Sequence, residues 1–307
     1  DLAEVPEHER DRMVQHAAHA LAATMQLGDT SAGTARRAVL THALGVLVER
    51  KGPRGIAGII ALLEEPDDDL VARFGRYDER LFKRLAGDLE TLRVSEEELF
   101  DPGAESLAAE TLLGRRAGGK VPLAIVSTRA LGDVDRVGAW VAHLLACLGC
   151  HAVKAPSTEL RALVLVEDAE LFMPAGAAKP PSKELLGDLL KRPRSGLGLV
   201  LSSQSPADFD HRSREHIHTW FLGRIADKRS LDRMKQLFEQ RPAVRGKLGT
   251  LEAGRFVVLQ DGAIADLARA PSLLRTDAPI EDAELLALAA ATRSPDRRDG
   301  DGGTTQG

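Results

Sequence analysis

Residues 7 to about 100 carry apolar side chains at helical spacing and no run that predicts a strand. The apolar positions fall three and four residues apart, and segments rich in Gly and Pro at 28–33 and 51–55 interrupt them. The periodic sets are Met13, Ala17, Ala20, Leu21 and Met25; Val39, Leu40, Ala43, Leu44 and Leu47; and Leu81, Leu85, Leu89 and Leu92. We therefore expect an all-helical subdomain at residues 1–112.

The pattern changes after residue 113, where short apolar runs alternate with helical stretches. Strands are predicted at 121–127, 162–168, 196–204 and 218–225, helices at about 134–149, 181–192 and 230–240, and a hairpin at 254–268 that turns at Asp261-Gly262. Such alternation is typical of a mainly parallel sheet covered by helices on both faces. The predicted fold class is α/β, with this core at 113–277 and a terminal helix and polar tail at 278–307.

Composition and charge limit the classes of protein to which this chain can belong, but they do not identify its function. The chain has 307 residues, 43% of them hydrophobic, and a formal net charge of −5. This balance excludes a general attraction to nucleic acid or anionic membranes, although a local basic pore remains compatible with DNA. No apolar run approaches the roughly 20 residues of a membrane span, and no signal-like segment is present. We expect a cytoplasmic protein that is not bound to a membrane.

The two cysteines, Cys147 and Cys150, are too few for a disulfide framework. Their sequence, CLGCH, has the spacing of a covalent haem site or a redox pair. Apolar residues before it recur at helical spacing, which favours two thiols buried at the end of a helix.

The segment GRRAGGKV, residues 114–121, fits the phosphate-loop pattern G-x-x-x-x-G-K-[ST] except at Val121. A phosphate loop follows a strand and opens a helix, so that backbone N–H groups face the phosphates. Here helical sequence precedes the motif and a predicted strand follows Lys120. We interpret Gly118-Gly119 as a loop that leads into this strand.

Adjacent acids end the predicted strand at 162–168. Four apolar residues run directly into Glu167 and Asp168, which places the acids at the carboxyl edge of the sheet, where ligands of open α/β sheets bind. One carboxylate could hold Mg²⁺ through water, and the next could polarise the attacking water of a nucleotide hydrolase. The two acids fit equally well a strand that ends in solvated side chains.

The next predicted strand adds polar groups at both of its ends. Gln204 follows it and could sense a γ-phosphate, or simply cap the strand. The turn KRPRSG at 191–196 precedes it. An arginine of this turn could act as an arginine finger in the site of a neighbouring subunit, or the segment could be a solvated basic turn. We expect the two acids, the amide and a guanidinium to lie along a single rim of the sheet.

From about residue 10 to 275, the chain resembles the C-terminal part of bacterial ATPases of the HerA–FtsK superfamily, in particular HerA-like DNA-translocase domains with a helical insertion. The resemblance rests on the order and spacing of LAIVSTRALGD (123–133), LVLVEDAELFMPAG (163–176), the segment 179–210, TWFLGRI (219–225) and LEAGRFVVL (251–259). It implies a RecA-like P-loop NTPase core with ATP and Mg²⁺. It also implies a homo-hexameric ring around DNA, a translocase or helicase activity and, in some members, a nuclease partner.

The resemblance also assigns roles to single residues. Glu167 falls on the position that binds Mg²⁺ through water, Asp168 on the catalytic acid and Gln204 on the sensor. Arg194 matches the arginine before the sensor strand better than Arg192 does.

Two departures from the family's pattern bear on activity. The acidic pair is E-D where the family usually has D-E, so each carboxyl group shifts by about a methylene, and we expect weakened turnover. The phosphate loop of the family lies upstream of the helical region, before Asp1. We therefore expect the chain to be a fragment of a longer ATPase and to bind ATP poorly by itself.

Other interpretations stay open. The chain could be a non-catalytic RecA-like scaffold or protein-interaction module, which the E-D order favours. Three histidines, His211, His216 and His218, lie close enough in sequence for a zinc site, but lack a further ligand at a recognised spacing. Arg224 could reach a nucleotide or a subunit interface, or pair with Asp227. The basic run at 228–235 is interpreted as a solvated helix face rather than a DNA contact.

Overall fold

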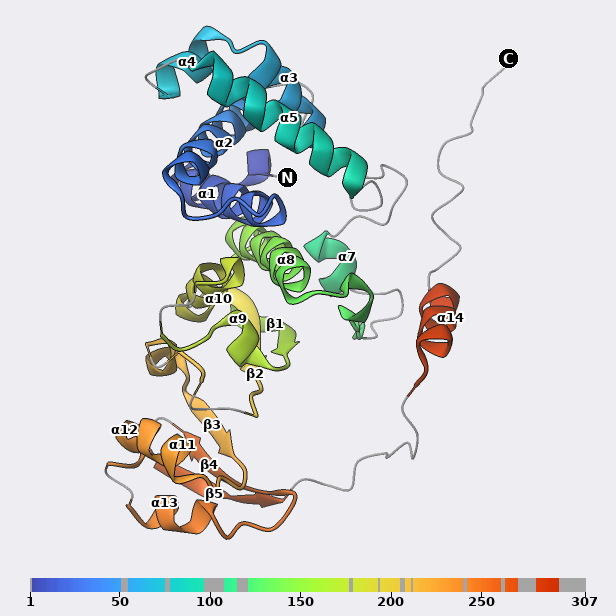
Figure 1. Ribbon diagram of the computed structural model, residues 1–307. Coiled ribbons are helices and arrows are strands. Elements are labelled where there is room, and N and C mark those ends of the chain that lie inside the picture. The colour runs from blue at the N-terminus through green and yellow to red at the C-terminus, as the bar shows by residue number, and fades with distance from the viewer. Residues whose placement is uncertain are drawn as a thin grey trace.

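The structure is a computed structural model of mixed α/β type, mostly helical, with a small parallel pair of strands. It describes residues 2–50, 55–74, 78–96, 108–114, 121–176, 179–192, 194–204, 208–210, 212–239, 242–260, 263–269 and 280–292. The helices of the N-terminal part, a middle layer and a small C-terminal unit follow one another along the molecule (Figure 1).

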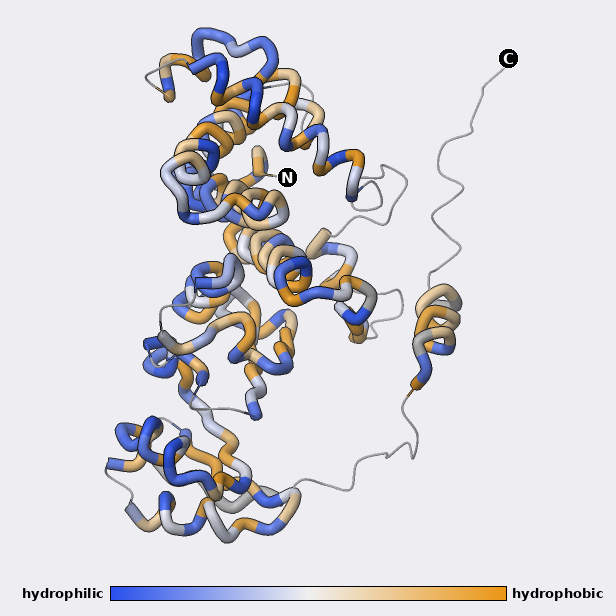
Figure 2. Tube along the Cα trace, viewed as in Figure 1, coloured by the Kyte–Doolittle hydropathy of each residue, from blue (hydrophilic) through white to orange (hydrophobic). Residues whose placement is uncertain are grey.

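The N-terminal part forms helices and has no strand among its described residues, as predicted. It comprises a short 3-10 turn and five helices, which are η1 (Leu2–Glu4), α1 (Glu7–Thr24), α2 (Ser31–Glu49), α3 (Ile56–Glu64), α4 (Asp68–Phe74) and α5 (Glu79–Ser95). The side chains of Thr30 and Asp78 cap α2 and α5 by accepting backbone N–H groups. Hydrophobic and hydrophilic stretches alternate along these helices (Figure 2). Their apolar sides enclose a core that includes Leu40, Phe82 and Leu89, which have no exposed surface.

The middle layer holds the parallel strands. Its elements are α7 (Ala109–Leu113), η2 (Arg129–Leu131), α8 (Val134–Lys154), β1 (Ser157–Val166), α9 (Ala169–Phe172), α10 (Pro181–Lys191) and β2 (Ser195–Leu201). β1 and β2 pair in parallel, with Leu163 opposite Gly198 and Leu165 opposite Val200. Alternate residues, among them Val164, pack on the core that α8 and α10 form.

The other face of β1 and β2 is bare among the described residues. Leu163, Leu165 and Val200 keep 63%, 59% and 42% of their surface exposed. Among the described residues, helices therefore cover one face of these strands, whereas the prediction was cover on both faces. The strand predicted at 121–127 is wrong, because residues 121–128 are described without regular structure and Ile125 is 80% exposed. Its continuous apolar run suits a buried strand, but no strand in the described part of the chain pairs with it.

The C-terminal unit has a sheet of its own. It contains η3 (Ser213–His216), β3 (Thr219–Leu222), α11 (Lys228–Arg233), α12 (Lys235–Phe238), α13 (Pro242–Leu248), β4 (Arg255–Gln260) and β5 (Ala263–Arg269), and the later helix α14 (Asp282–Thr292) lies apart (Figure 1). β3, β4 and β5 are antiparallel, so the predicted strand at 218–225 does not extend the parallel sheet. The predicted hairpin is confirmed, although its turn lies outside the described residues. The helix predicted at 230–240 breaks at Met234, which has φ −97° and ψ 9°.

Helix α8 ties the N-terminal helices to the middle layer. It packs against α1 on one side and α10 on another. Its 21 residues also make it long and apolar enough to cross a membrane, which corrects the expectation that no such run exists. Since 44% of its apolar window is buried inside the protein, this property fits the core helix of a folded domain.

Candidate functional site

The carboxyl ends of β1 and β2 bring an acid and an amide together. Backbone hydrogen bonds continue past the strands, from Ser202 N to Val166 O and from Ala169 N to Ser202 O, both at 2.9 Å. They hold the residues after β1 beside those after β2. Gln204 Nε2 then donates a long hydrogen bond of 3.4 Å to Asp168 Oδ1. This contact agrees with the prediction that Asp168 and Gln204 meet at one edge of the sheet.

Asp168 has an unusual backbone conformation. Its φ of 46° and ψ of 47° lie in the left-handed region, at the point where β1 turns into α9. Left-handed conformations cost about 1–2 kcal/mol for most L-residues, and Asp is among the few that adopt them readily. An Asp at this position therefore tolerates the turn that aims its carboxylate along the sheet edge better than a longer acid would.

The donors at this edge suit a Mg²⁺–phosphate ligand in part. Glu167, Asp168 and Gln204 are all exposed, and Mg²⁺ is usually held by one or two carboxylates with water and phosphate oxygens completing its shell. The described residues supply the carboxylates and the amide. No glycine-rich cradle for phosphates is found among them.

The arginines predicted for this rim lie elsewhere, which corrects that expectation. Arg194 precedes β2, and its carbonyl accepts a hydrogen bond of 3.0 Å from Ser157 N at the start of β1. A seven-residue strand spans about 20 Å at about 3.3 Å per residue, so Arg194 and Gln204 lie at opposite edges of the sheet. Arg194 is exposed, and its side chain cannot complete the site of its own chain.

Arg192 is a structural residue in this fold. Its guanidinium binds Glu9 at 3.0 Å and Asp188 at 2.9 Å, with 13% of the side chain exposed. Burial opposes the charged form, but these hydrogen bonds outweigh it and raise the pKa of Arg192. The ion pairs join α1 to α10, so Arg192 is not free to act as the alternative finger.

Three further candidates have separate positions. Arg224 follows β3 in the antiparallel sheet, is exposed, and forms no ion pair with another described residue. Asp227, its suggested partner, instead caps α11 through the N–H groups of Arg229 and Ser230. His211 lies outside the described residues, and no group of three metal-binding side chains occurs in the described part of the chain.

The cysteines and the glycine-rich segment give no site. Cys147 and Cys150 are half-buried in α8, and burial raises the pKa of both thiols, that of Cys150 to about 11. A raised pKa keeps them as unreactive thiols. Residues 115–120 of the GRRAGGKV motif lie outside the described residues, and Gly114 ends α7.

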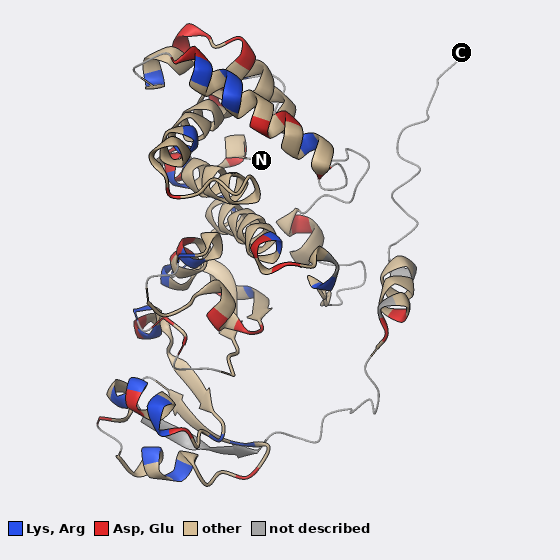
Figure 3. Ribbon diagram, viewed as in Figure 1, with Lys and Arg blue, Asp and Glu red and all other residues tan. Residues whose placement is uncertain are grey.

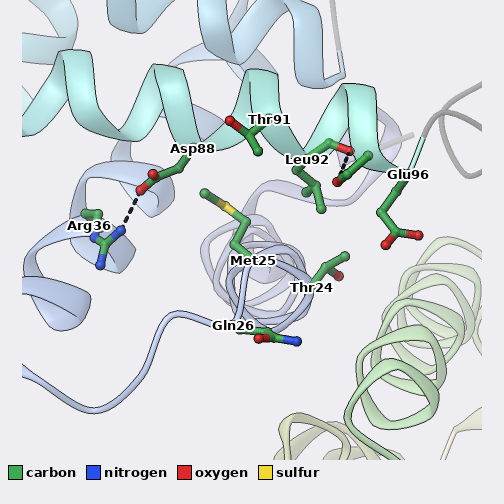
Figure 4. A pocket seen from close by; sticks show the side chains of 9 residues that line it. Thr24, Met25, Gln26, Arg36, Asp88, Thr91, Leu92 and Glu96 are labelled. Atoms are coloured by element: carbon green, nitrogen blue, oxygen red, sulfur yellow. Dashed lines mark hydrogen bonds and ion pairs between the residues drawn. The ribbon is translucent and has the colours of Figure 1, made fainter. Parts of the chain in front are cut away.

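A polar hollow lies between the ends of α1 and α5 and the start of α2 (Figure 4). Its volume is about 340 Å³. Its charged groups are already paired, Arg36 with Asp88 across the hollow and Glu96 with Arg136 of α8. Because these charges are satisfied within the protein, the hollow has no unpaired charged group with which to select a charged ligand.

Comparisons with known proteins give little beyond this geometry. No protein-family model and no curated protein matches the chain. The similar solved structures include two of the genome-packaging NTPase B204 from Sulfolobus turreted icosahedral virus 2, one in complex with ATP-gammaS and one with AMP. Each has 14% sequence identity and covers 56% of this chain and 73% of that chain, with TM-scores of 0.37 and 0.34. Similarity at this level carries no argument about function.

Sequence reasoning missed one exposed aromatic side chain. Phe221 in β3 is 66% exposed, although its apolar neighbours suggested a buried strand. The signal lay in the alternation of Thr219 and Phe221 with Trp220 and Leu222, which predicts one outward and one inward face.

Proposed function

We propose that the chain is part of an ATP-hydrolysing motor of the HerA–FtsK type that acts on DNA as a translocase or helicase. The observation that carries the proposal is the contact between Asp168 and Gln204 at the carboxyl edge of two parallel strands. Ligands of open parallel sheets bind at this edge, and an acid beside an amide suits a site that positions a water for attack on a phosphate.

Each side chain has a distinct role in this proposal. Glu167 holds Mg²⁺ through water, Asp168 polarises the attacking water, and Gln204 orients that water or senses the γ-phosphate. When bound, Mg²⁺–ATP would supply the phosphoryl group and neutralise its charge. The phosphate cradle has to come from residues other than those described.

Arg194 supports a ring in which sites lie between subunits. It is exposed at the amino edge of the sheet, about 20 Å from the acids of its own chain by strand length. An arginine finger supplied in trans stabilises the transition-state charge. We infer a homo-hexameric ring, with Arg194 of one subunit facing the acids of the next, and a nuclease as a further candidate partner.

The test measures ATP turnover of the natural protein that carries this sequence, with and without DNA. Asp168→Asn keeps the size and the left-handed backbone of this residue but removes its charge, so we expect turnover to fall at least about 100-fold. Arg84→Ala, an exposed change on α5, serves as the control. DNA-independent turnover, or turnover that survives Asp168→Asn, contradicts the proposal.

Mixing variants tests the arrangement between subunits. Arg194→Ala and Asp168→Asn should each be inactive alone. If the finger acts in trans, mixed rings contain interfaces with both native residues and regain part of the activity. Absence of recovery, with mixed rings verified by cross-linking, contradicts the role of Arg194.

A non-catalytic scaffold is the second candidate, and the bare face of β1 and β2 favours it. Leu163 and Leu165 are exposed two residues apart on one face of β1, and they form an apolar surface of the kind found at protein interfaces. A protein that never turns over ATP, and in which Leu165→Ser abolishes capture of a partner protein, would support this function instead.

A further inference from the structure

An antiparallel bridge joins the two chain segments that follow Asp168 and Gln204. Pro174, six residues after Asp168, pairs with Phe209, five residues after Gln204. Two backbone hydrogen bonds of 2.6 and 2.9 Å flank this pair, and Phe209 is only 5% exposed. The bridge therefore holds the segment after Gln204 beside the segment after Asp168.

Helix α10 anchors the first of these segments within the middle layer. Ser182, which has no exposed surface, donates from Oγ to Phe172 O at 3.0 Å. Lys183 donates from Nζ to Pro174 O at 2.6 Å. These bonds hold the segment after Asp168 to α10, whereas the segment after Gln204 is attached to the C-terminal unit.

Arg214 makes this attachment. It lies half-buried in η3 and donates from Nη2 to Phe209 O at 3.1 Å and from Nη1 to Arg233 O at 3.2 Å. Arg233 is the last residue of α11, so the guanidinium binds a carbonyl at the end of this helix, where a positive charge is favourable. One side chain thus connects the bridge with the C-terminal unit.

An ion pair adds a second connection at the same place. Arg233 Nη1 lies 2.9 Å from Asp208 Oδ1, and 42% and 61% of the two side chains are exposed. The charges suit this contact, because Lys and Arg gather on α11, α12 and α13 (Figure 3), and Asp232, the acid of α11, is paired with Arg245. An exposed pair contributes little to stability, so we assign the main connection to Arg214.

The contact between Gln204 and Asp168 is sensitive to small displacements. Its length of 3.4 Å exceeds the usual 2.9–3.0 Å of an N–H···O hydrogen bond, so a shift of Gln204 by about 0.5 Å would either complete the bond or break it. A misplacement of about 1 Å that originates far from the chemistry can lower turnover about 100-fold.

We propose that Arg214 is a positioning residue of the Asp168–Gln204 edge, and that the C-terminal unit regulates this edge through it. The guanidinium ties Phe209 to the end of α11 and so stabilises the bridge that keeps the segment after Gln204 in place. A displacement of α11 removes this support. The inference rests on the proposed function for its effect on turnover, whereas its effect on the bridge needs no ATP.

Hydrogen exchange of the full chain, followed by mass spectrometry, tests the effect on the bridge. Peptides that contain the bonded amides of Ala175 and Asp210 should exchange at least about ten-fold faster in Arg214→Ala, the factor implied by loss of one hydrogen bond to a charged group. Arg214→Lys keeps the charge but not the two-pronged reach and should give an intermediate rate. Arg212→Ala, an exposed arginine two residues away, is the matched control, and unchanged exchange in α5 excludes general unfolding.

ATP turnover of the natural protein that carries this sequence tests the effect on the site. Arg214→Ala should lower kcat about 10- to 100-fold and leave KM for ATP within about two-fold, because none of the joint's residues lies at the edge itself. A residue that only stabilises the fold would leave kcat per folded molecule unchanged. Asp208→Arg and Arg233→Asp should each lower kcat less, and the double variant, which restores the pair with reversed charges, should recover it.

The two measurements distinguish failure of this inference from failure of the ATPase proposal. Exchange at the bridge that is the same in Arg214→Ala and Arg212→Ala overturns the role of Arg214, as does faster exchange with an unchanged kcat or a change in KM alone. A parent protein that hydrolyses no ATP refutes the ATPase proposal, and faster exchange in Arg214→Ala then still supports its role in holding the edge.

Discussion

Replacing Arg192 by Ala should destabilise the fold without removing a catalytic group. The guanidinium bridges Glu9 of α1 and Asp188 of α10, and the three side chains are 13%, 17% and 21% exposed. Breaking a fully buried ion pair costs about 3–5 kcal/mol, and an exposed pair contributes about 0.2–1 kcal/mol. Arg12 still pairs with both acids in the variant, so the expected loss lies between these limits, at about 2 kcal/mol.

Thermal unfolding followed by circular dichroism measures this loss. One kcal/mol shifts the midpoint of a large domain by about 2–4 °C, so Arg192→Ala should melt about 4–8 °C lower. Arg194→Ala, two residues away and exposed, should stay within about 0.5 kcal/mol of the parent. Equal stability of the two variants, or a larger loss for Arg194→Ala, would refute the structural assignment of Arg192.

Acid provides an independent check on the same network. Hydrogen bonds from Arg192 and Arg12 outweigh the effect of burial and lower the pKa of Glu9 below its usual 4.5. A carboxylate with a lowered folded pKa stabilises the fold above the unfolded pKa, and this stability is lost as the pH falls through the folded pKa. The difference between parent and Arg192→Ala should therefore be full at pH 7 and shrink below pH 4.5.

Two further predictions concern the helices. His143 Nε2 of α8 lies 2.9 Å from Thr24 Oγ1 of α1, and burial lowers the pKa of His143 below its usual 6.5. Because the unfolded chain then binds the proton more readily, the free energy of unfolding should fall as the pH drops below 6.5. Urea titrations should show a weaker dependence on pH in His143→Gln. Gly33→Ala should cost about 1–3 kcal/mol of stability by overpacking, because its Cβ would meet the backbone oxygen of Gly28. Gly87→Ala has open space around it and should instead stabilise α5 by about 0.5–1 kcal/mol. Melting curves that rank the two variants the other way would contradict this packing.

The helices could be predicted because their signals are local. Periodic apolar residues define α2, α5 and α8, and the caps Thr30, Asp78 and Asp133 stand directly before them. A helix satisfies its own backbone groups, so its sequence contains most of the information that forms it.

Strands depend on partners that the local sequence does not specify. The run at 121–127 is continuously apolar, as in a buried strand, but no strand among the described residues pairs with it and most of its side chains are exposed. The run at 219–222 does form a strand, but its partner is β4 in an antiparallel sheet rather than the parallel pair. Pattern alone gives the period of a strand and leaves its neighbour undetermined.

The candidate site was predictable to the extent that parallel strands impose order. Residues that follow neighbouring parallel strands meet at one edge, which is why Asp168 and Gln204 lie together. The same rule places a residue before a strand at the opposite edge, so Arg194 had to lie away from them. Phe221 escaped notice because an apolar run suggests burial unless its alternation is followed residue by residue.

The Arg192 network gives the helical part of the protein a physical connection to the proposed arginine finger. Arg192 holds α1 through Glu9 and lies two residues before Arg194, whose carbonyl pairs with the start of β1. A displacement of α1 relative to α10 would therefore act on the turn that presents Arg194 to a neighbouring subunit. In a ring that completes its sites in trans, the helical part would then adjust the finger of one subunit rather than the acids of its own.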